Sequence, residues 1–204
     1  MKNGIIMLMA AFILLVCSGF VQAAQTPVCM EADEILTAQS PGITLGEFKA
    51  LWEKEGKTPE GSVRCLIIAV LETVKEGNKD GKKMWAMTLS KDYVDKNGEP
   101  DSSQRLAIDQ FSRIVKGTNF RGGIAASYLG GTPANGYSCS YGNKVEVDEN
   151  NTRRSDDQVK LFVRSGGKDN PSPVLMKKNK DGYWKIFEYS SLFTGVKAIE
   201  SGDF

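Results

Sequence analysis

Residues 58–77 read TPEGSVRCLIIAVLETVKEG, and they carry the clearest helical pattern in the chain. Thr58 is a favourable N-cap, and Pro59 suits the first helical position because the N–H that it lacks would be unpaired there anyway. Six apolar residues then recur at the i, i+3, i+4, i+7 spacing that places side chains on one stripe of a helix. They are Val63, Leu66, Ile67, Val70, Leu71 and Val74. The stretch therefore predicts an amphipathic helix that ends at Gly77.

Further helices are expected on either side of this stretch. A second helix is predicted over residues 103–116, with Gly117 as its stop. Its inward positions are Ala107, Ile108, Phe111, Ile114 and Val115. Shorter helical patterns cover residues 45–54, 83–89 and 30–37. The first half of the chain is therefore predicted to be helical.

The second half of the chain has the two-residue period of β-strands. Val159, Leu161 and Val163 alternate with residues that would face the other side of a sheet, as expected for a half-buried strand. Residues 179–182, Asn-Lys-Asp-Gly, favour a hairpin turn because Asp-Gly tolerates positive φ. Strands are predicted at residues 123–129, 144–148, 159–165, 173–178 and 183–189.

The order of these elements predicts an α+β fold. Helices precede strands, and no linker is long enough to divide the chain into two domains. The N-terminal helices are therefore expected to pack on one face of a C-terminal antiparallel sheet, a meander of about five strands. This single domain is predicted to span residues 24–204.

Residues 1–23 have the layout of a secretory signal peptide. Lys2 supplies the charged start, an apolar run follows over residues 4–16, and Val21 and Ala23 stand at the −3 and −1 positions of a cut after Ala23. Cleavage would leave 181 of the 204 residues. The pattern predicts export to the periplasm or out of the cell.

Two alternatives to a cleaved signal stay open. An uncleaved segment would anchor the protein in a membrane, although the apolar run is shorter than the roughly 20 residues that a spanning helix needs. A lipid attached to Cys17 is the other alternative, and Val16 is larger than the residue expected before a lipidated cysteine. Contact with a membrane is expected only through this segment, if it is retained.

Composition narrows the chemistry that the chain can perform. The sequence contains no histidine, which excludes Ser-His-Asp and Cys-His nucleophiles and histidine-ligated zinc. Without residues 1–23, the chain has 25 basic and 25 acidic residues, so it has no basic excess that would favour nucleic acid. No cofactor motif or metal-ligand spacing is present. An enzyme built on this chain would have to use carboxylates, lysine or tyrosine as acid and base.

Three cysteines remain after residue 23, namely Cys29, Cys65 and Cys139. Export places them in an oxidising compartment, where at most one internal bridge can form from an odd number of thiols. Cys65 falls nearly opposite the apolar stripe of its helix, so it is expected to be available for bonding outside the core. A bridge between Cys29 and Cys65 is predicted.

Three loops are expected to meet at one end of the predicted meander. Alternate connections of such a sheet share an end, which brings together residues 130–143, 166–172 and 190–195, opposite the turn at 179–182. Loops are frequent places for binding residues. The candidate binding residues here are Tyr137, Arg164, Lys168, Asp169, Tyr189 and Ser190. The alternative is that Gly, Pro and Asn in these loops only serve the turns.

Three stretches of the second half resemble an uncharacterised bacterial family. They are SYLGGTPANGY at residues 127–137, KLFVRSGGKDNPSPV at 160–174 and DGYWKIFEYSSLFTGV at 181–196. The family is known only as a domain of unknown function, and the resemblance extends best over residues 105–196. It implies no activity, cofactor or catalytic residue.

Two functional hypotheses follow from these patterns. The first is an exported, non-catalytic module that binds a protein or small ligand of the cell envelope. The second is a histidine-free, cofactor-independent hydrolase or lyase that uses carboxylates or tyrosine. A deep pocket with two close carboxylates, or with a lysine of displaced pKa, would favour the enzyme.

Overall fold

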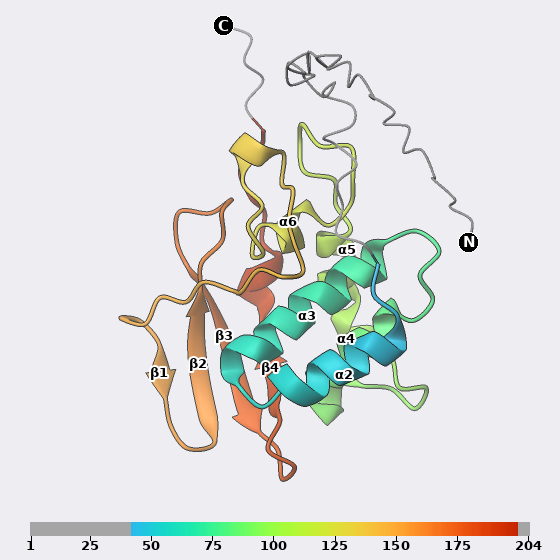
Figure 1. Ribbon diagram of the computed structural model, residues 1–204, viewed down its shortest axis with the longest axis vertical. Helices are drawn as coiled ribbons and strands as arrows, with labels where there is room; N and C mark the ends of the chain where they lie inside the picture. The colour runs from blue at the N-terminus through green and yellow to red at the C-terminus, as the bar shows by residue number, and fades with distance from the viewer. Residues whose placement is uncertain (1–41, 200–204) are drawn as a thin grey trace, which may run out of the picture. The chain divides into compact units, whose positions relative to one another are not determined.

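The computed structural model describes residues 42–199, in which helices precede strands (Figure 1). The α-helices are α2 (Leu45–Glu55), α3 (Pro59–Val74), α4 (Gly81–Thr88), α5 (Arg105–Phe111) and α6 (Gly123–Ala126). The 3-10 helices are η1 (Lys91–Tyr93), η2 (Ser102–Gln104), η3 (Pro133–Asn135) and η4 (Ser190–Phe193). The strands are β1 (Arg153–Arg154), β2 (Gln158–Val163), β3 (Ser172–Lys178) and β4 (Trp184–Glu188). The α+β prediction is confirmed.

Helix α3 is the centre of the described domain. Its N-cap is Thr58, whose hydroxyl accepts a hydrogen bond from the Gly61 N–H, and Pro59 is the first helical residue, as predicted. The helix contacts α2, α4, α5, α6 and strands β2 and β4, so neighbours lie on every side of it. Burial consequently extends beyond the predicted apolar stripe.

The burial of Cys65 corrects one expectation. Its side chain is 0% exposed and belongs to the hydrophobic core, although it lies off the stripe of α3. The prediction of an available thiol was wrong because neighbours cover α3 all round. Burial also raises the pKa of Cys65 to about 12. Cys29 lies outside the described residues, as does the helix predicted at 30–37, so the Cys29–Cys65 bridge stays a prediction; no disulfide joins cysteines within residues 42–199.

Four strands form one antiparallel sheet in the order β1-β2-β3-β4, so the meander has four described strands where about five were predicted. The register pairs Leu161 with Val174 and Met176 with Ile186. These residues are buried, together with Val159, Val163 and Trp184, and they face the helices. Asn179–Gly182 makes the predicted hairpin turn, with Gly182 at φ +84°.

Two predicted strands were wrong. Residues 123–126 form helix α6, which follows Gly122 at φ +94°. The strand prediction failed here because a short buried apolar run fits a helix as well as a strand. Residues 144–148 make only one isolated bridge, between Val147 and Val163. The sheet instead begins with the edge strand β1, which lies between the strands predicted at 144–148 and 159–165.

Helix α5 is shorter than predicted. The chain enters it through η2 and leaves the helix after Phe111. Ile114, expected to face inward, is 56% exposed because the helix has already ended. Ala107 and Phe111 are buried as expected. Within residues 42–199, no helix has the length and apolar character needed to cross a membrane.

The turn between α2 and α3 docks directly on strand β4. The Ser62 hydroxyl donates to the carbonyl oxygens of Trp184 and Gly56, at 2.8 and 3.1 Å, and the Trp184 N–H donates to Gly56 at 2.8 Å. Gly61 lets the turn close, since a Cβ there would lie 2.2 Å from the Glu55 carbonyl oxygen. This contact fixes the start of α3 against the sheet.

The glycine pairs Gly130-Gly131 and Gly166-Gly167 pack against each other beyond the other end of the sheet. A Cβ on Gly166 would lie 2.3 Å from the carbonyl oxygen of Gly131, closer than real Cβ contacts come. The Gly166 N–H donates to the Ser127 carbonyl at 2.8 Å, and the Ser165 hydroxyl donates to the Ser127 hydroxyl at 2.7 Å. The loop after β2 therefore packs backbone to backbone against the segment after α6.

Gly166→Ala should lower the free energy of unfolding by about 2 kcal/mol, because the added methyl must displace the backbone of residue 131. Gly195→Ala is the matched control, since its Cβ would meet no atom within 4 Å and should change stability by less than about 0.5 kcal/mol. Urea unfolding of both variants measures this difference. Equal stability of the two variants would show that the loops separate easily.

Candidate functional site

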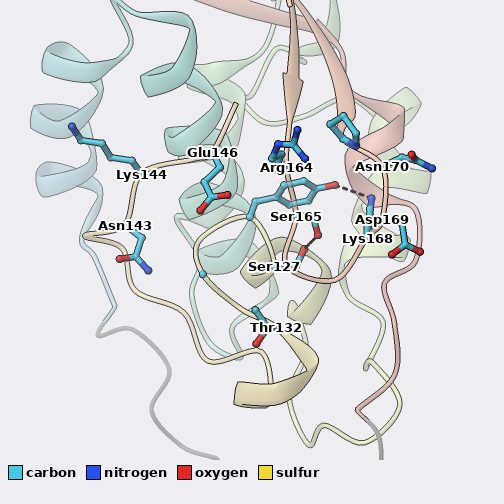
Figure 2. Close-up of a pocket in the computed structure, with 14 residues that line it drawn as sticks. Ser127, Thr132, Asn143, Lys144, Glu146, Arg164, Ser165, Lys168, Asp169 and Asn170 are labelled. Atoms are coloured by element: carbon cyan, nitrogen blue, oxygen red, sulfur yellow. Dashed lines mark hydrogen bonds between the residues drawn. The ribbon is translucent and has the colours of Figure 1, made fainter. Parts of the chain in front are cut away.

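A half-open cavity of about 520 Å³ lies where the interlocked glycine loops meet the end of the sheet (Figure 2). Its walls come from the end of α6, from residues 130–132 and 143–146, and from the loop between β2 and β3. The volume is in the range of small-molecule sites. Among the predicted site residues, Arg164, Lys168 and Asp169 line it.

Lys168, on the β2–β3 loop, forms the inner wall between this cavity and a second hollow of about 400 Å³, which Ser172, Ser191 and Thr194 line. Its ammonium donates to the Tyr128 hydroxyl at 2.7 Å, the Ser191 carbonyl at 2.8 Å and the Thr194 hydroxyl at 2.9 Å. Burial lowers the pKa of Lys168 to about 8. Carbonyl oxygens can only accept, so these bonds favour the charged ammonium at neutral pH.

Tyr128 supplies the hydroxyl that accepts a hydrogen bond from Lys168. It follows helix α6, is 2% exposed, and also lies 2.9 Å from the Ser172 hydroxyl. Its O–H donates to the Leu192 carbonyl at 3.1 Å. Burial raises the pKa of Tyr128, so the phenol stays protonated. Tyr128, Lys168 and Ser172 together tie α6, the β2–β3 loop and strand β3 to η4.

The outer wall of the cavity is charged. Arg164 forms an ion pair with Asp148, with 3.1 Å between Nη2 and Oδ2. Its backbone N–H donates to the Glu146 carbonyl at 2.8 Å, which sets these two residues opposite each other. Glu146 is exposed, and its carboxylate makes no ion pair within residues 42–199. Asp169 instead pairs with Lys197 at 2.5 Å.

Two of the predicted binding residues are buried structural tyrosines. Tyr137 is 0% exposed, and its hydroxyl donates to the Lys197 carbonyl at 2.6 Å. Gly167 makes room for this ring, since a Cβ there would lie 2.6 Å from the Tyr137 hydroxyl. Tyr189 is 4% exposed, and its hydroxyl donates to Gln104. Neither side chain lines the cavity.

Ser190 is exposed but lies elsewhere. It lines a smaller hollow of about 230 Å³ beside η2 and β4, and its hydroxyl donates to Glu188. Tyr137 and Lys168 nevertheless lie at the same end of the sheet, opposite the turn at 179–182, because the β2–β3 loop returns beside the glycine segment (Figure 1). The predicted cluster of loops therefore exists, while its aromatic members face the core.

Sequence reasoning missed Tyr128, Ser172 and Glu146 as neighbours of the cavity. Tyr128 lies within residues 123–129, which were predicted to be a strand, and that prediction did not place it next to Lys168. Glu146 stood within another predicted strand, and only the bridge between Val147 and Val163 brings it to the wall. The SYLGG and VRSGG stretches both contribute residues that line the cavity.

A family model described as a domain of unknown function, DUF6935, matches residues 43–200. The chain belongs to the DUF6935 family. The match covers the N-terminal helices as well as the sheet, so it extends beyond the part in which the resemblance was clearest. No curated protein and no solved structure matches the chain.

The cavity gives the DUF6935 domain a polar site with separated charges. No group of three or more acidic or cysteine side chains within residues 42–199 is arranged to hold a metal ion. Of the hydroxyls that Lys168 contacts, those of Tyr128 and Ser172 are 2% and 4% exposed, and the exposed Thr194 does not line the cavity. A solute in the cavity would therefore meet the charged rim more readily than these buried hydroxyls.

The stability contributed by Lys168 should depend on pH. Its folded pKa of about 8 is below the value of about 10.4 for an unfolded lysine, so the unfolded chain binds more protons between these values. Relative to a Lys168→Met variant, the free energy of unfolding of the natural protein should therefore rise as pH increases from 8 to 10. Urea unfolding of both proteins across this range measures the difference, and a difference independent of pH would contradict it.

Proposed function

We propose that the protein is an exported binding module of the cell envelope, and that its cavity takes a small polar ligand. The observation that carries this proposal is the half-open cavity of about 520 Å³ with Glu146, Arg164 and Lys168 in its walls. The signal-like pattern of residues 1–23 supports export. The periplasm or the cell exterior is the compartment that follows from it.

The state of the hydroxyl groups favours binding over catalysis. A nucleophilic hydroxyl needs a base and a path to its substrate. Ser172 is buried, and the Ser165 hydroxyl donates to Ser127, so neither points freely into the cavity. The neighbouring ammonium of Lys168 is held in its charged form by carbonyl acceptors, and a charged ammonium is not a base.

A hydrolase or lyase remains the second candidate because one observation favours it. Lys168 has a pKa lowered to about 8 by burial, and its nitrogen lies 2.7 Å from the Tyr128 hydroxyl. A lysine of lowered pKa that is hydrogen-bonded to a tyrosine hydroxyl is suitable for proton transfer in a protein without histidine. Chemical conversion of a bound compound would establish this candidate in place of the first.

Export should be visible in the mass of the protein. Expression of the full chain in an exporting bacterium is expected to yield periplasmic or secreted protein that begins at Ala24. Intact-mass spectrometry of the cell fractions measures this. Protein that keeps residues 1–23 in a membrane fraction would support the anchored alternative, and full-length protein in the cytoplasm would contradict export.

Filling the cavity should abolish ligand binding without unfolding the domain. Asn170 is exposed on the cavity wall, so Asn170→Trp should block the cavity and change stability by less than about 0.5 kcal/mol. Asn150→Trp, on an exposed turn before β1, is the matched control. An NMR screen of amino acids, sugars and small phosphates against both variants measures binding, and mass spectrometry of the bound compound reports any conversion. Compounds that bind the two variants equally would contradict the proposed site.

A further inference from the structure

Three charged side chains that line the cavity, those of Lys144, Glu146 and Lys168, make no ion pair with any of residues 42–199. Lys144 extends away from Glu146 in Figure 2, so the charges of Glu146 and Lys168 are the two to be balanced within the cavity. Glu146 makes no ion pair with any of residues 42–199, and Arg164 is already paired with the buried Asp148. The group formed by Glu146, Asp148 and Arg164 therefore keeps one net negative charge on the outer wall. A free ammonium group is the ligand feature that complements it.

The inner wall has the opposite charge. The hydrogen-bond partners of the Lys168 ammonium are hydroxyl and carbonyl oxygens, and no carboxylate of residues 42–199 pairs with it. Asp169, the adjacent carboxylate, is committed to Lys197. One positive charge is thus left without a counter-charge where solvent is partly excluded, and a ligand carboxylate would complement it.

The two charges stand apart within one cavity. Figure 2 shows Glu146 and Lys168 on different sides of the site, with the side chain of Arg164 between them in the view. A ligand with a single charge would satisfy one wall and leave the other unbalanced. A ligand with a positive and a negative end satisfies both.

We infer that the ligand is a zwitterion with a free amine and a free carboxylate, of the class of α-amino acids and short peptides. The inference rests on the proposed binding function and names the substrate class of that same site. Glu146 binds the amine, and Lys168 binds the carboxylate by redirecting its longest bonds, which reach the Leu192 carbonyl at 3.3 Å and the Ser172 hydroxyl at 3.4 Å. Arg164 holds the outer wall in place through Asp148.

A series of glycine peptides tests this assignment in the unaltered protein. Glycine, diglycine, triglycine and tetraglycine at pH 7 separate the two charges by increasing lengths, and calorimetric titration should find one length that binds best. N-acetylation or C-terminal amidation of that peptide removes one charge, and each should weaken binding by about tenfold or more, the loss expected for one hydrogen bond between charged groups.

Variants assign each end to its residue. Glu146→Gln should remove the preference for a free amine while keeping the preference for a free carboxylate, and Lys168→Gln should do the reverse. Glu53→Gln, on the exposed face of α2, is the matched control and should preserve both preferences. Lys168 also stabilises the fold through its hydrogen bonds, so Lys168→Gln could fail to fold. In that case the blocked peptides and Glu146→Gln alone test whether the ligand is a zwitterion.

The possible outcomes separate the two proposals. Blocked and free peptides that bind equally, or a cavity that accepts sugars or phosphates but no zwitterion, would overturn the zwitterion inference and leave the binding module standing. A cavity that binds no compound of any of these classes would overturn both.

Discussion

The enclosure of α3 is the constraint on which the rest of the structure depends. A helix covered on every side has to find partners for its polar residues as well as for its apolar ones. Glu72, buried within α3, accepts hydrogen bonds from Asn78 at 2.6 Å and from the Tyr141 hydroxyl at 2.5 Å, and pairs with Lys75 at 2.7 Å. Burial and this carboxylate raise the pKa of Tyr141. The central helix is therefore bonded to a loop of the second half.

The same helix sets the position of one cavity wall. Arg64 donates to the carbonyl oxygens of Tyr141 and Asn143, the latter at 2.9 Å, and forms an ion pair with Glu55 at 2.6 Å. The chain held in this way continues directly into Glu146, on the outer wall of the cavity. A residue of α3 thus acts on the site without touching it, which explains how a helical first half positions a site built by the second half.

The sequence predicted those features of the fold that a local pattern can specify. The N-cap and stripe of α3, the α2 segment, the 179–182 turn and three of the strands follow from spacing and turn chemistry. The two wrong strands were short apolar runs, whose state depends on what covers them. Tyr137 and Tyr189 were assigned to an open rim because tyrosine suits both a rim and a core. Which of the two applies depends on Gly167 and Gln104, far from these tyrosines in sequence.

Exceptions to local rules gather around the loops that build the cavity. Tyr137, at φ +60°, is a non-glycine residue in the left-handed region, Gly131 and Gly166 touch through their backbones, and Lys168 carries a charge without a counter-charge among residues 42–199. Each of these features costs free energy that a plain connector would avoid. Proteins keep such costs most often where a site requires them. The unbalanced charges of Glu146 and Lys168 therefore have their simplest physical explanation in a solute that balances both when it binds.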